Sequence, residues 1–263
     1  AEFIIELSND MALGDIEFNL LTNATGPNDY AFEANLTFNV NVSLHQAGFP
    51  ADVSGEIISS VGILDLRTDG SEEIMSVNKN GFVHVFNTDG SEWIDDDFPY
   101  ETGDQNWGSP SISDIDTDGN DDVVVSSKNG NIYFFSIYPN DINDIYYINF
   151  DGFITSTPAF GQLNEGSDLD LVFAQYGGDR MLFALDNASN SSINNNFPIN
   201  IDEKVQRGVA LADFNGNGFD DIGVGTDDEY IHLIHDDGTI AWSYETGGDI
   251  RVAPSVLELN TGE

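Results

Sequence analysis

The sequence predicts an all-β protein in which one short, strand-rich unit recurs along most of the chain. Residues 32–44 alternate apolar and polar side chains, which is the period of a half-buried strand. No segment carries the helical period over a useful length. From residue 48 onward an acidic loop returns at intervals of 49, 48, 51 and 45 residues, with its first position at Asp65, Asp114, Gln162, Asp213 and Glu258.

Composition narrows the possible partners. The 263 residues include 47 Asp and Glu, no Cys, and a formal net charge of −40, which fits either a solvated surface or a secreted protein in a cation-rich medium. Disulfides and thiolate metal sites are excluded. No apolar run approaches the roughly 18 residues of a membrane-spanning helix, so no membrane insertion is expected. The 7 basic residues are scattered singly, so we expect no basic face for nucleic acid: Arg67, Lys79, Lys128, Arg180, Lys204, Arg207 and Arg251.

Residues 1–46 are expected to form the last strands of a β-sandwich module. Strands are predicted at residues 3–7, 15–21 and 32–44, with a turn cluster at 25–29. These strands are too few for an independent sandwich, so an upstream portion is expected. In composition the segment resembles the end of the Ig-like or adhesion-type modules of large secreted bacterial proteins.

Residues 47–263 are expected to form a β-propeller. In each unit a strand leads into the acidic loop, an apolar run follows it, a turn leads to a third strand, and a fourth, more polar stretch completes the unit. Four-stranded units at this period are typical of propeller blades. The predicted blades are residues 47–95, 96–144, 145–195 and 196–241, with a partial fifth at 242–263, so the propeller is expected to continue further. An aromatic stands sixteen residues before each loop and is expected to pack between blades: Phe49, Phe98, Tyr146, Phe197 and Trp242.

The acidic loops carry the strongest chemical signal. In loop two, residues 114–122, Asp occupies the first, third, fifth and ninth positions, and Gly119 allows a sharp turn at the sixth. Alternate residues of a tight loop can direct carboxylates at one point, and Ca²⁺ takes roughly six to eight oxygen ligands. Without a cation these carboxylates would repel one another. The alternative is a set of polar turns that close strand pairs with no ion.

The pattern D-x-D-x-D-G-x-x-D, preceded by Gly108-Ser109-Pro110 and followed by an apolar strand, resembles the FG-GAP or VCBS-type repeat. That repeat builds the calcium-binding propellers of integrin α subunits and of many secreted bacterial proteins. The resemblance covers about residues 48–263, and it implies that the acidic positions and one main-chain carbonyl hold Ca²⁺. We expect weaker binding in loop four, residues 213–221, because two of its ligands are neutral amides. The implied ligands are Asp114, Asp116, Asp118, the Asn120 carbonyl and Asp122 in loop two, and Asp213, Asn215, Asn217, the Phe219 carbonyl and Asp221 in loop four.

The other loops depart from the pattern. Loop one, residues 65–73, has Arg67 at its third position, where a guanidinium could neutralise the neighbouring acids itself. Loop three, residues 162–170, begins with Gln162 and has Gly166 at its fifth position. We expect neither loop to bind an ion, and the loop that starts at Glu258 stops before its ninth position.

The sequence gives only weak signals for any chemistry other than calcium binding. His84 and His232 share one repeat position, which indicates packing or a solvated strand face rather than a zinc site. No nucleophile or metalloprotease motif occurs, and we expect no catalytic residue. Trp93 and Trp107 fall outside the repeated aromatic position, so either could contact a ligand. Residues 176–180 replace the usual turn of the third unit and are a candidate for specificity.

The expected function is therefore that of a binding or structural module, in adhesion or as a scaffold, within a larger secreted or surface protein. Its loops would be presented to a protein or glycan ligand on the cell surface or in the extracellular matrix, with contacts to flanking domains or self-assembly. The alternative is a non-catalytic accessory domain of a secreted protease or polysaccharide-degrading enzyme. A third hypothesis, an active site near the central channel, would require acids and a base that the blades do not share.

Overall fold

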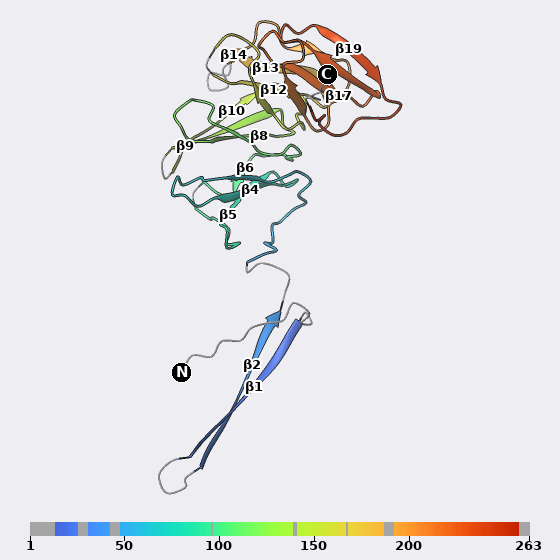
Figure 1. Cartoon of the computed structure of the whole chain (residues 1–263). Coiled ribbons are helices and arrows are strands. Elements are labelled where there is room, and N and C mark those ends of the chain that lie inside the picture. The colour runs from blue at the N-terminus through green and yellow to red at the C-terminus, as the bar shows by residue number, and fades with distance from the viewer. Residues whose placement is uncertain are drawn as a thin grey trace, which may run out of the picture. The chain divides into compact units, whose positions relative to one another are not determined.

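The computed structural model describes residues 14–25, 31–42, 48–95, 97–138, 141–166, 168–186 and 192–257, and every regular element within these ranges is a β-strand (Figure 1). The chain divides into two compact units, residues 1–51 and residues 52–263. The described residues include no helix that is long and apolar enough to cross a membrane.

The described part of the first unit is one antiparallel hairpin. Strand β1 (Gly14–Thr25) pairs along its whole length with β2 (Ala31–Val42). Phe18 lies opposite Phe38, and their rings stack with centroids 5.5 Å apart. These two strands match the alternation in the sequence. The strand predicted at residues 3–7 lies outside the described residues, and the assignment to a β-sandwich stays a prediction.

The second unit contains four antiparallel sheets, numbered here one to four in chain order, and consecutive strands are neighbours in each sheet. The predicted all-β architecture of propeller blades is therefore confirmed. Sheet three differs in detail, because two short strands both pair with its third strand. Sheet one consists of β3 (Gly62–Leu64), β4 (Glu73–Val77), β5 (Phe82–Phe86) and β6 (Tyr100–Glu101); sheet two of β7 (Ser111–Ser113), β8 (Asp122–Ser126), β9 (Asn131–Tyr138) and β10 (Asp141–Asn149); sheet three of β11 (Ala159–Gly161), β12 (Asp170–Ala174), β13 (Met181–Asp186), β14 (Ser192–Ile193) and β15 (Ile199–Asn200); sheet four of β16 (Val209–Ala212), β17 (Asp221–Gly225), β18 (Tyr230–Ile234) and β19 (Ile240–Glu245).

The boundaries between the sheets lie later in the chain than the sequence predicted. Strand β6 pairs with β5 and β10 pairs with β9, although residues 96 and 145 were expected to open new blades. Likewise β19, which contains residue 242, pairs with β18 of sheet four. The fourth strand has no uniform apolar run, so alternation alone does not locate it. From Phe98 onward the repeated aromatic therefore lies in or just before the last strand of a sheet and does not begin the next sheet.

The hydrophobic core lies in the seams between neighbouring sheets. Three clusters of buried apolar residues fill the seams, and together they hold the four sheets in sequence. One cluster joins Met75 of β4 to Phe135 of β9, a second joins Phe134 of β9 to Phe173 of β12, and a third joins Val172 of β12 to Val224 of β17.

The repeated aromatics mark these seams, with two exceptions, Phe49 and Trp242; Phe49 precedes sheet one and belongs to none of the three clusters. Phe98 and Phe197 are only 2% and 6% exposed and belong to the seam clusters, as predicted. Tyr146 stacks on Phe134 at 4.8 Å. Trp242 is 46% exposed, because β19 pairs only with β18 among the described strands.

Candidate functional site

Each acidic loop joins the first strand of its sheet to the second, as the sequence predicted. The ninth residue of the loop opens the second strand and is buried in all four sheets, with exposures of 1%, 1%, 1% and 0% for Glu73, Asp122, Asp170 and Asp221. Its carboxylate accepts a hydrogen bond from the main-chain N–H of the loop's second residue, at 2.9, 3.1, 2.7 and 2.9 Å in loops one to four. The ninth acid therefore closes the loop in every sheet, whether or not an ion is bound.

The first position is also held by the main chain. Asp114 accepts from Asp118 N at 3.1 Å and from Gly119 N at 3.0 Å. Asp213 accepts from Gly218 N at 2.9 Å and from neighbouring amides, and these hydrogen bonds hold the pKa of its carboxyl below the ordinary value. The loop backbone thus fixes both ends of the acidic pattern before any ligand is considered.

Loop two brings three carboxylates together. Oxygen atoms of Asp114, Asp116 and Asp122 all lie within 4.8 Å of one another. Oxygens that share a Ca²⁺ at about 2.3–2.6 Å are separated by up to roughly 5 Å, so this donor set fits the ion that the sequence predicts. Asp118 is not one of the three, and its Oδ1 accepts from Asn120 N at 2.8 Å and from Asn120 Nδ2 at 2.9 Å.

The third position distinguishes loop two from the other loops. In loop one, Arg67 Nη1 lies 3.9 Å from Glu73 Oε1. In loops three and four, an Asn amide nitrogen donates to the ninth acid, with distances of 3.2 Å from Asn164 Nδ2 to Asp170 Oδ2 and from Asn215 Nδ2 to Asp221 Oδ1. Loop two alone of the four has carboxylates at both its third and ninth positions, so its charge is not balanced by an N–H donor at the third position.

Loop four carries a partner that the sequence analysis missed. His235 Nδ1 lies 2.8 Å from Asp221 Oδ1, and this hydrogen bond raises the pKa of the imidazole. Asn217 Nδ2 donates to Asp236 at 2.8 Å. Three of the five predicted ligands of loop four, Asn215, Asn217 and Asp221, thus form hydrogen bonds with the hairpin that follows β18. The signal in the sequence was the His that follows the third strand of sheet four.

A second set of residues lies at the opposite ends of the second strands, where the chain leads into each first strand. Ser60 N donates to Ser109 Oγ at 3.0 Å, and Ser109 N donates to Thr157 Oγ1 at 2.8 Å. Thr157 N then donates to Arg207 O at 2.8 Å. The three hydroxyl residues each stand five positions before the first loop position, so they link sheets one, two, three and four in turn. The repeat contained this signal, but it was not recognised.

Basic and aromatic side chains gather at the same end. Lys79 and Lys128 hold their ammonium groups 5.6 and 5.3 Å from the centre of the Trp107 ring, and Lys204 lies 5.5 Å from that of Tyr176. The Trp107 and Tyr176 rings are themselves 6.3 Å apart. Some of the cations that are scattered in the sequence thus lie close together, with Lys79 also paired to Glu56 at 2.8 Å, and the expectation of no basic face for nucleic acid stays a prediction. Lys79 and Lys128 stand at one repeat position, and folding brings the copies together.

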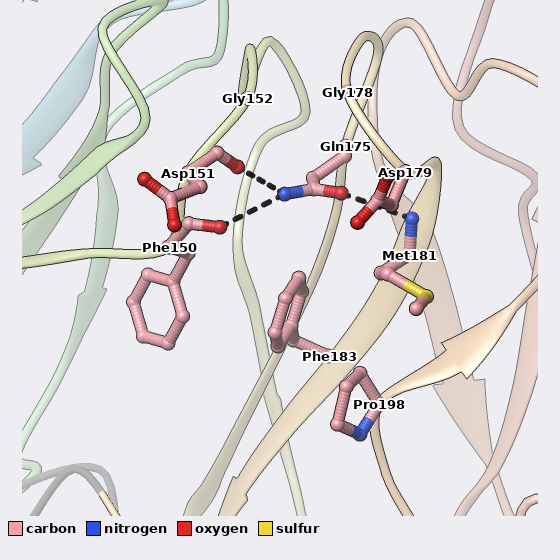
Figure 2. Close-up of a pocket in the computed structure, with 9 residues that line it drawn as sticks. All are labelled: Phe150, Asp151, Gly152, Gln175, Gly178, Asp179, Met181, Phe183 and Pro198. Atoms are coloured by element: carbon pink, nitrogen blue, oxygen red, sulfur yellow. Dashed lines mark hydrogen bonds between the residues drawn. The ribbon is translucent and has the colours of Figure 1, made fainter.

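A cavity of about 280 Å³ lies against sheet three (Figure 2). Gln175 spans it: its Nε2 donates to the carbonyls of Phe150 and Asp151, and its Oε1 accepts from Met181 N at 3.1 Å. Phe183 forms part of the apolar wall. Since the amide of Gln175 is fully used in joining the two loops, the cavity offers a ligand little beyond apolar contacts and the exposed Asp151 and Asp179.

Comparison with known proteins identifies a fold and no family. No family model matches the chain, and no curated protein matches it. A solved structure of BBS1N in complex with ARL6DN, soaked with lead, is similar with a TM-score of 0.56 and 12% identity, over 76% of this chain and 60% of that one. A mercury-soaked structure of the same complex gives a TM-score of 0.41 at 13% identity, over 74% and 68% of the two chains. The chain thus spans 60% of the length of the first of these structures, and the likeness shows the propeller-like fold alone.

Proposed function

We propose that this chain is a calcium-stabilised, extracellular propeller module that serves in binding or as a scaffold and not in catalysis. The convergence of Asp114, Asp116 and Asp122 at the start of β8 carries the proposal. The acidic pattern, the four-stranded sheets and the resemblance to FG-GAP repeats support the same conclusion. A net charge of −40 and the absence of Cys are consistent with secretion into a cation-rich medium.

The residues of loop two suit a structural role for the ion. Asp114 follows β7, and Asp122 opens β8, so ligands from both ends of the loop would tie the first two strands of sheet two together. Bound Ca²⁺ would supply the positive charge that the third position supplies in loop one. A ligand that binds only the folded state at about a hundred times its Kd stabilises that state by roughly 2.7 kcal/mol.

Calcium titration by calorimetry, combined with thermal unfolding in Ca²⁺ and in chelator, tests the metal site. Asp116→Asn should weaken calcium binding at least about tenfold and remove most of the calcium-dependent rise in Tm, because one anionic ligand is lost. In chelator the same variant should be as stable as the parent protein or more so, since a repulsion is removed.

Asp121→Asn is the matched control. Asp121 stands in the same loop, loses the same charge on substitution, and is exposed and outside the three carboxylates. It should bind Ca²⁺ almost as the parent does. No calcium heat in the parent protein, or equal weakening by both variants, would refute the site in loop two.

A further inference from the structure

The lead-in segments of the four first strands surround a hollow of about 400 Å³. Its lining includes Ser60, Ser109 and Thr157, together with Trp107 and Arg207. These segments belong to sheets one to four, so the hollow lies where the sheets converge. A volume of this size falls in the range of small-ligand sites, which is about 300–1,000 Å³.

Arg207 is held in place with part of its guanidinium free. Its Nη1 donates to Ile58 O at 3.3 Å and to Trp107 O at 2.9 Å, carbonyls that lead into sheets one and two. No hydrogen bond from Nε or Nη2, and no ion pair, joins Arg207 to any described residue. That free edge is the planar fork that binds a carboxylate through two parallel hydrogen bonds.

Hydroxyl groups and Arg251, which pairs with Asp249, supply the rest of the polar lining. Ser109 Oγ and Thr157 Oγ1 each accept a main-chain N–H, which fixes their positions around the hollow. Ser59 Oγ, also on the lining, is enclosed and has no hydrogen-bond partner among the described residues. A buried hydroxyl without a partner is costly, and a change of the Ser59 rotamer that turns Oγ into the hollow would let a bound polar group satisfy it.

The charged residues that line the hollow, Arg207 and Arg251, are both basic, whereas the protein as a whole has a formal net charge of −40. Lys128 and Lys204 lie over the Trp107 and Tyr176 rings and form no ion pair with any residue that the structure describes. Among the acids near these basic residues, Glu56 pairs with Lys79 at 2.8 Å and Asp249 with Arg251 at 2.7 Å, and Asp227 accepts from the neutral amide Nε2 of Gln206 at 2.9 Å.

We propose that this hollow binds the carboxylate of a uronic acid residue in an acidic polysaccharide. The free edge of Arg207 takes the carboxylate, and the ring of serine and threonine hydroxyls takes the sugar hydroxyls. Such a lining favours a sugar over an acidic peptide, because sugar hydroxyls both donate and accept hydrogen bonds, whereas ionised acidic side chains only accept them. The proposal deepens the proposed binding function by naming its ligand class, and it rests on that function.

The test uses a hyaluronan tetrasaccharide and its carboxyl-reduced form, titrated calorimetrically into the whole chain in saturating Ca²⁺. The acidic sugar should bind, and the carboxyl-reduced sugar should bind at least about tenfold more weakly. Arg207→Lys keeps the charge and loses the fork, so it should cost about tenfold in affinity, and Ser59→Ala about threefold. Arg180→Lys is the matched control, because Arg180 lies outside the hollow and also donates through Nη1 to a carbonyl, that of Asp202.

Three results would overturn the proposal. They are equal binding of the two sugars, equal losses in Arg207→Lys and Arg180→Lys, and tighter binding of hexaglutamate than of the tetrasaccharide, which would assign the hollow to acidic peptides. Calcium binding and Tm are measured on the same samples. Failure of sugar binding with an intact calcium response refutes this inference alone, and the two-sugar comparison on the parent protein stands even if Arg207→Lys does not fold.

Discussion

Loops two and four have the same length, the same place between first and second strands, and Gly at the sixth position, yet they balance their charge differently. Asp116 adds a carboxylate beside Asp122, whereas Asn215 donates its amide to Asp221. One change of atom type at the third position thus separates loop two, where we propose that Ca²⁺ balances the carboxylates, from loop four, where an amide of the chain donates to the buried acid.

The hairpin that follows β18 adds to this difference in charge balance between loops two and four. His235 stands 22 residues after Asp213 (235 − 213) and lies 2.8 Å from Asp221 Oδ1. At the same offset after Asp114 stands Ser136, whose hydroxyl carries no charge. Loop four therefore has a basic group of the protein's own beside its buried acid, and loop two has none at that position.

The largest effect is expected from Asp221→Ala. The substitution removes the acceptor of Phe214 N, the Asn215 amide and His235 in a site that is 0% exposed, and should cost about 3 kcal/mol of unfolding free energy. Because the bonds that are lost are internal, the cost should be the same in Ca²⁺ and in chelator, as measured by urea unfolding. A loss that appears only in Ca²⁺ would instead support the calcium site that the sequence predicts in loop four.

Asn215→Asp gives loop four the third residue of loop two, and it should make the stability of the protein depend on Ca²⁺ at loop four. In chelator it should destabilise the fold by about 1–2 kcal/mol, because a donor to Asp221 becomes a repelling carboxylate. Saturating Ca²⁺ should restore that loss, and calorimetry should register stronger binding at one site. Asn195→Asp, at an exposed position outside the loop, controls for the added charge. A calcium response identical to that of the parent protein would show that the third position does not determine whether the loop binds Ca²⁺.

The sequence predicted the features of the fold that depend on the spacing of residues along the chain. The four-stranded sheets follow from a repeat of roughly 48 residues, and the acidic loops follow from Asp at alternate positions. The placement of Asp118 outside the three carboxylates could not be predicted, because Asp at the fifth position fits the alternating pattern as well as Asp at the first and third. Spacing in the sequence predicts which residues lie near one another. Hydrogen bonds between side chains then determine which of them remain available to bind a metal ion.

Contacts between different sheets also could not be predicted from the sequence. Arg207 reaches a carbonyl 149 residues away, at Ile58, and nothing local in the sequence marks that contact. The gathering of Lys79 and Lys128 on Trp107 depends on two copies of one repeat position facing a third segment. A search of each repeat position for its side-chain chemistry across all units would have found the lysines and the hydroxyls, although not the arginine.

The smallest effect is expected in loop one, where Arg67 occupies the third position. Arg67 donates to Asn87 at 2.9 Å and lies 4.5 Å from the centre of the Trp93 ring, and its side chain is 36% exposed, so Arg67→Met should cost only about 1 kcal/mol.

The pH dependence of Arg67→Met is the sharper test. Burial raises the pKa of Glu73 above its ordinary value, while the hydrogen bond from Leu66 N and the charge of Arg67 oppose that rise. Without Arg67 the pKa of Glu73 should rise further. A carboxyl whose pKa is raised by folding binds its proton more tightly in the folded state, so stability falls as pH increases from the unfolded pKa to the folded one. Urea unfolding across the weakly acidic range should therefore show a steeper fall in the variant than in the parent protein. If stability falls equally with pH in the variant and the parent protein, Arg67 does not balance the charge of Glu73, and the third position has no such role in loop one.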